Sequence, residues 1–79
     1  MTTYQIRYEG PATVALRVAT ALADAEGVDL RASDAPRTLD AGTVQLAVTV
    51  DGGADDVLDA VGTVRGWLPV GASIEIVSA

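Results

Sequence analysis

The residues best equipped for chemistry are four aspartates that lie close together in the chain. They are Asp51, Asp55, Asp56 and Asp59. Several carboxylates together form the ligand set that a hard cation such as Ca²⁺ or Mg²⁺ prefers, but this spacing does not match the loop of an EF-hand. Acidic residues are also common in the first turn of a helix, because the helix dipole favours negative charge there. The spacing therefore favours the beginning of a solvated helix over a metal site, and we expect no metal and no cofactor.

Other catalytic chemistry is limited by the residue types that the chain lacks. The sequence contains no His, Cys or Lys, which removes the usual general bases, thiolate nucleophiles and Schiff-base amines. A carboxylate-based enzyme would need two acidic groups in unequal environments, and the pattern indicates no buried pair of that kind. We therefore expect that the protein is not an enzyme.

Two glycine-containing segments resemble parts of known ligand sites. Asp51-Gly52-Gly53 precedes a predicted helix, but it lacks the Lys and the glycine spacing of a phosphate-binding loop, so it indicates a turn. Gly10-Pro11 lies between a predicted strand and a predicted helix, where metabolite sensors of the ACT type bind amino acids. The beginning of a helix also accounts for this pair, since Pro is well placed in the first turn. An ACT-like regulatory domain that binds a small metabolite near Gly10, or at a dimer interface, is the alternative function.

Hydrophobic periodicity predicts the elements that position these residues. Alternating apolar residues predict strands over 4–8, 28–32, 44–50 and 73–77, and apolar spacings of three and four predict helices over 12–26 and 54–68. Residues 33–42 are expected to form a polar connection. Because each strand buries one face only, we expect an α+β, ferredoxin-like βαββαβ sandwich, in which a four-stranded antiparallel sheet carries both helices on one face. Residues 1–79 make a single domain of this kind.

Charge and composition limit the partners. Eleven acidic residues against five Arg give a formal net charge of −6, which disfavours nucleic acid and anionic membrane surfaces. Tyr4 and Tyr8 are expected to point inward, which leaves the open sheet face without the aromatic rings on which RNA bases stack. The chain has no pattern typical of a signal peptide or a membrane span, and without Cys nothing indicates an oxidising compartment. We expect a cytoplasmic protein, and the composition is typical of a GC-rich bacterial genome.

The predicted helix 54–68 carries the candidate interaction surface. On a helical wheel, Asp55, Asp59, Gly62 and Gly66 lie away from the residues expected in the core. Two exposed glycines each cost about 0.5–1 kcal/mol relative to Ala, which sequence drift or the close approach of a partner backbone would explain. Trp67 lies on the flank of this helix. A lone Trp is usually peripheral core, yet Trp is also enriched among binding hot spots.

The predicted helix 12–26 has an apolar stripe on the side away from Val14. Its members are Ala12, Leu16, Ala19 and Ala23. We expect this stripe to pack against the helix 54–68; otherwise it forms an exposed apolar strip.

Over nearly its whole length the chain resembles bacterial effector-associated domains, in particular the small effector-associated constant component of prokaryotic conflict systems. The segments that carry the resemblance are Ile6-Arg7-Tyr8-Glu9-Gly10-Pro11, Val28-Asp29-Leu30-Arg31, residues 44–50, and Val64-Arg65-Gly66-Trp67-Leu68 leading into Ser73-Ile74-Glu75-Ile76. The chain departs from that family at Pro69-Val70-Gly71, a short connection where a basic segment is more typical.

The resemblance implies a noncatalytic adaptor that couples effector enzymes, such as proteases or nucleotide-hydrolysing switches, to partners carrying a related module in bacterial antiviral defence. We accordingly predict a protein–protein interaction module whose partner is an effector enzyme or a related module. It would use the surface of Asp55, Asp59, Gly62, Gly66 and Trp67, or a free sheet edge that adds a partner strand. A homodimer is compatible with this prediction.

Overall fold

Two long central strands organise the molecule. In the computed structural model, which describes residues 2–78, β1 (Thr2–Pro11) and β4 (Thr43–Gly52) pair antiparallel along their full length. Side chains on one face of this pair, such as Ile6, Tyr8 and Val48, are buried, as expected for strands that alternate between core and solvent. The face that these residues define carries the hydrophobic core.

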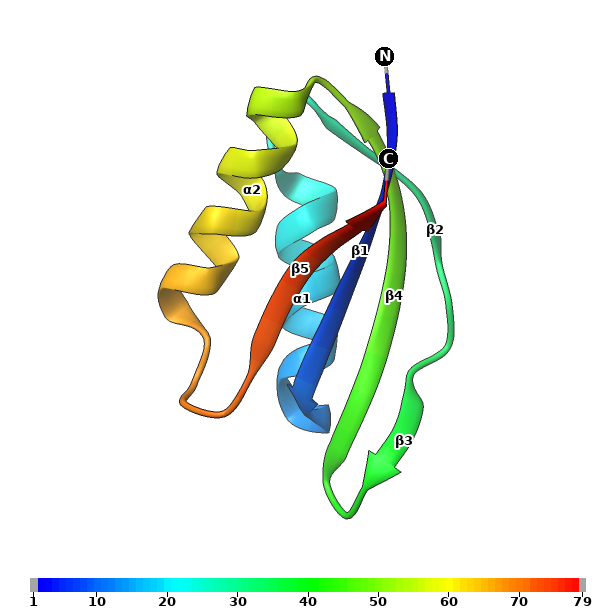
Figure 1. Ribbon diagram of the computed structural model, residues 1–79, viewed down its shortest axis with the longest axis vertical. Coiled ribbons are helices and arrows are strands. Elements are labelled where there is room, and N and C mark those ends of the chain that lie inside the picture. Colours follow the sequence, from blue (N-terminus) through cyan, green and yellow to red (C-terminus); the bar gives the residue numbers. More distant parts are fainter. Residues whose placement is uncertain (1, 79) are drawn as a thin grey trace.

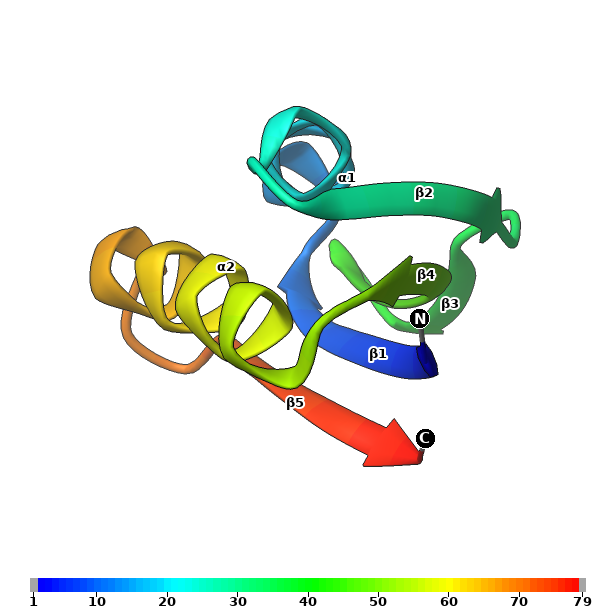
Figure 2. The same cartoon turned by 90° about the horizontal axis from the view of Figure 1, so that it is seen from above.

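The remaining elements surround this central pair. They are α1 (Ala12–Asp24), β2 (Val28–Ser33), β3 (Arg37–Asp40), α2 (Ala54–Trp67) and β5 (Ser73–Ser78). The strands form one antiparallel sheet in the order β2-β4-β1-β5, and β3 also pairs with β4 (Figure 1). Both helices cover the same face of the twisted sheet (Figure 2). The fold is therefore α+β, and no helix among residues 2–78 is long and apolar enough to cross a membrane.

The sheet has five strands, so the predicted count of four was wrong. The stretch expected as a connection contains β3, which pairs Arg37 with Gln45 and Thr38 with Val44. A register shift between Leu30 and Ala32 disturbs the pairing of β2 with β4, and Pro36, which has no N–H to donate, lies between β2 and β3. The predicted strand 28–32 corresponds to β2, and β3 adds a second short strand along the same partner, β4.

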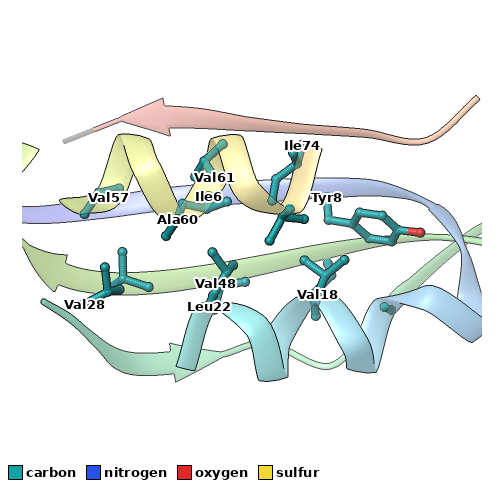
Figure 3. Close-up of a cluster of buried hydrophobic side chains, with 14 of the residues drawn as sticks. Ile6, Tyr8, Val18, Leu22, Val28, Val48, Val57, Ala60, Val61 and Ile74 are labelled. Carbon is teal, nitrogen blue, oxygen red and sulfur yellow. The ribbon is translucent and has the colours of Figure 1, made fainter. Parts of the chain in front are cut away.

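The core between the sheet and the helices is built from small side chains. Val18 and Leu22 of α1 and Val57 and Val61 of α2 point toward the buried face of the sheet (Figure 3). The largest fully buried side chain is Tyr8, whose hydroxyl donates a hydrogen bond of 2.9 Å to the carbonyl of Pro11. The polar end of this ring is therefore satisfied at the junction where α1 begins.

The apolar stripe of α1 does not pack against α2 as expected. Ala12 and Ala23 are exposed, Leu16 is 78% exposed, and only Ala19 is half-buried. The physical reason is the rotation of α1, which turns Val18 and Leu22 to the sheet and places the Ala21 side nearer α2. Most of the stripe is therefore solvent-facing.

Candidate functional site

The predicted interaction surface of α2 lies in the open. Asp55, Asp59, Gly62 and Gly66 are all exposed, and a Cβ added at either glycine would meet no atom within 4 Å. No contact within the described fold therefore accounts for these two glycines. Trp67, the last residue of α2, is half-buried and packs against the core.

The helices α1 and α2 lie antiparallel to one another (Figure 1), and residues of both helices line two neighbouring pockets that together form a groove. We call this feature the helix groove. Its first part is an acidic pocket of about 550 Å³ where the end of α1 lies beside the beginning of α2. Four carboxylates line this pocket: Asp24, Glu26, Asp56 and Asp59. No basic side chain is among its lining residues, so the pocket has a negative potential.

The second part of the helix groove is an apolar pocket of about 480 Å³. Leu16, Arg17 and Ala21 line it from α1, and Trp67 lines it from α2. The Arg17 guanidinium lies over the Trp67 ring, 4.4 Å from its centroid, a cation–π arrangement that restrains both side chains. Ala21 lines both pockets, so the acidic and apolar parts adjoin one another.

The structure does not assemble the aspartates into a metal site. Among the described residues, no group of three or more His, Cys, Asp or Glu is arranged to hold a metal ion. Asp51 instead accepts hydrogen bonds from Thr3 Oγ1 at 2.5 Å and from Arg31 Nη1 at 2.8 Å. The Thr3 hydrogen bond and the charge of Arg31 hold the pKa of Asp51 below its usual value. Asp55 and Asp56 lie in the first turn of α2, as the helix dipole favours.

The open face of the sheet is polar and carries two ion pairs. Arg7 of β1 forms an ion pair with Glu75 of β5, in which the guanidinium also donates a hydrogen bond to the carboxylate. This hydrogen bond and the charge of Glu75 raise the pKa of Arg7. Arg31 and Asp51 form a second pair. Tyr8 is buried and Tyr4 is half-buried against the core, so both tyrosines point inward as expected.

Gly10 is enclosed by protein atoms. A Cβ at this position would lie 2.6 Å from Tyr8 Oη and 2.7 Å from Ala72 Cβ. Close packing of the Tyr8 ring against β1 therefore accounts for Gly10, and the space beside it is filled. Gly27, which follows α1, has a positive φ of 78°, and a Cβ there would clash with the Asp56 carboxylate. This close approach brings the end of α1 to the beginning of α2.

The sequence identified some groove residues and missed others. Asp59 and Trp67 line the two pockets, whereas Asp55, Gly62 and Gly66 are not among the lining residues of either pocket. Asp56 was considered with Asp59 as a possible cation ligand, but Asp24 and Glu26 were not linked to them, since they come from a segment far away in the chain. The available signal was topological: two antiparallel helices on one sheet face bring the end of one beside the beginning of the other.

Comparison of the chain with protein-family models found no match, and comparison with curated proteins also found none.

Proposed function

We propose that the protein is a noncatalytic protein–protein interaction module that recognises its partner through its helix layer. The observation that supports this most strongly is the apolar pocket, where Leu16 is 78% exposed beside Trp67. An exposed leucine beside a half-buried tryptophan offers apolar area that a partner can bury, and Trp is enriched among binding hot spots. The exposed glycines of α2 lie outside both pockets and offer a second contact region, since a partner backbone can approach closely above them.

We further propose a ferredoxin-like arrangement for the fold. The strand order β2-β4-β1-β5 supports it, because two βα units are interleaved so that β4 lies between β1 and β2. In this interpretation β2 and β3 together take the place of a single edge strand. The proposal concerns architecture alone, since one fold can carry many functions.

The resemblance to effector-associated domains supports the adaptor role. In this proposal the chain couples an effector enzyme, or a protein with a related module, to another component of bacterial antiviral defence in the cytoplasm. The acidic charge of −6 is consistent with a protein partner in preference to nucleic acid or an anionic membrane. The filled space beside Gly10 gives no support to a metabolite site at that position.

The experiment is quantitative affinity capture from source cells with the wild-type chain and the double variant Gly62→Ala, Gly66→Ala. The variant should gain about 1–2 kcal/mol of folding stability, because both glycines are exposed in a helix, and should lose a stoichiometric partner that the wild type retains. Leu39→Gln, on exposed β3, is the control and should retain the partner. Retention of every partner by the double variant would show that the α2 surface is wrong. Reproducible turnover of a substrate by the purified wild type, abolished by an Asp→Asn change, would overturn the noncatalytic function itself.

A further inference from the structure

We propose that the helix groove binds a cationic amphipathic helix from a partner protein, with an apolar side chain against Leu16 and Trp67 and a Lys or Arg side chain at the acidic pocket. This inference rests on the proposed interaction function and adds the chemistry of the partner. Helix-in-groove recognition of this kind uses apolar anchors that recur on one face of the bound helix.

The apolar pocket supplies the anchor site. Leu16 is largely exposed, and the half-buried Trp67 ring packs against the core and lies under the Arg17 guanidinium, which restrains it. A tryptophan with a restrained orientation loses little conformational entropy when a partner binds. The Arg17 charge lies over this ring, so the apolar pocket does not extend the negative potential of the acidic pocket.

The acidic pocket supplies charge complementarity. Asp24 and Glu26 approach from the end of α1, and Asp56 and Asp59 approach from the first turns of α2. No Arg of this chain lines the pocket or forms an ion pair with these four carboxylates in the described structure. A cationic side chain from outside would therefore relieve repulsion among them. A second copy of this acidic chain is a poor occupant for the same reason, because it would add negative charge.

The two pockets have a spacing that matches a helix. Asp24 lies eight residues after Leu16 on α1, and Asp59 lies eight residues before Trp67 on α2. At a rise of about 1.5 Å per residue, each interval is about 12 Å. Because the helices are antiparallel, both intervals run between the same two pockets. A partner helix covers this distance in about two turns, so residues seven positions apart reach both pockets from one face.

The test uses three synthetic helical peptides of about 18 residues, long enough to form helix on an Ala-rich background. The first places two Leu and two Arg on one face, with each Leu seven residues from an Arg. The second has the same composition with the Arg residues moved to the opposite face. The third replaces the Arg residues with Glu. Binding is measured by Trp67 fluorescence, and the contact surface is mapped from the backbone amide shifts of the labelled protein.

The proposal expects the first peptide to bind at least about tenfold more tightly than the other two, with shifts confined to α1 and α2. Leu16→Gln should weaken binding about tenfold, because it removes an exposed anchor without disturbing the core. Asp24→Asn with Asp59→Asn should weaken it about two- to fivefold per charge and reduce its salt dependence. Leu58→Gln, on the other side of α2 and 58% exposed, is the matched control and should change nothing.

Equal binding of the three peptides, shifts confined to the sheet, or no binding of the first peptide at millimolar concentration would each overturn the groove assignment. So would a concentration-dependent dimer in which the same α1 and α2 amides shift, because a second copy would then be the occupant. The two proposals fail separately. If Leu16→Gln retains the captured partner while the Gly62→Ala, Gly66→Ala variant loses it, the interaction function stands and the cationic helix is wrong.

Discussion

At the scale of single residues, the glycines of this chain separate into those that the fold requires and those that it does not. A Cβ at Gly10 would lie closer to Tyr8 and Ala72 than real Cβ contacts allow, whereas one at Gly66 would meet open space. We expect Gly10→Ala to lower the free energy of unfolding by about 1–3 kcal/mol through overpacking. Gly66→Ala should raise it by about 0.5–1 kcal/mol through helix propensity. Urea denaturation of the two variants measures both, and a tolerated Gly10→Ala would contradict the tight packing of the Tyr8 ring.

Burial of Tyr8 makes the free energy of unfolding depend on pH. Burial raises the pKa of Tyr8 above its usual value of about 10. In the unfolded chain the phenol loses its proton first as the pH rises, so the stability that neutral Tyr8 contributes is complete below about pH 10 and is lost above it. We expect the free energy of unfolding to fall at alkaline pH in the wild type and to fall less in Tyr8→Phe. The variant should also be less stable at neutral pH by about 0.5–1.5 kcal/mol, because the hydrogen bond to Pro11 is lost. Identical alkaline slopes would show that Tyr8 does not titrate differently in the two states.

At the scale of elements, the periodicity of the sequence predicted the helices well, because helices depend on contacts between residues close together in the chain. Both helices were found within about two residues of their predicted ends, because Val18, Leu22, Val57 and Val61 repeat at helical spacing. β3 was missed for two reasons: all its residues are exposed, so it has no apolar alternation, and its position depends on pairing with β4, which local periodicity does not show. The acidic pocket was missed for the same reason, since it exists only where α1 meets α2. The rotation of α1 about its axis could not be predicted either. Leu16 is hydrophobic, which favoured a buried position, but the rotation of α1 leaves it exposed.

The division of the edge into β2 and β3 has a dynamic consequence. β3 is short, has no buried residue and is paired on one side only, so few buried contacts oppose its opening. Local opening free energies approach zero for such segments and approach the global value in core strands. We expect the β3 amides that pair with β4 to exchange with solvent many times faster than those of β1. Amide exchange followed by NMR measures this, with the β5 edge strand as a control of intermediate protection. Equal protection of β3 and β1 would show that the sheet opens only as a whole.

At the scale of the whole molecule, the charge that favours a cationic partner also acts on stability. The ion pairs Arg7–Glu75 and Arg31–Asp51 lie on the open sheet face, whereas the acidic pocket brings four carboxylates together with no Arg among its lining residues. The helix layer and the open sheet face therefore differ in electrostatic character. The net charge of −6, and the partners that it disfavours, follow from the sequence alone. The uneven distribution of the carboxylates over the surface depends on the tertiary structure.

This distribution gives opposite salt effects on folding and binding. Repulsion among Asp24, Glu26, Asp56 and Asp59 weakens when salt screens exposed charges. We expect the free energy of unfolding at neutral pH to rise by a few tenths to about 1 kcal/mol between about 10 mM and 200 mM NaCl, measured with urea because guanidinium is itself a salt. The affinity for the Leu- and Arg-bearing peptide should fall over the same range. Asp59→Asn is the control, since it removes part of the repulsion and should reduce both responses. A loss of stability on adding salt would mean that the two ion pairs of the sheet outweigh the repulsion at the groove.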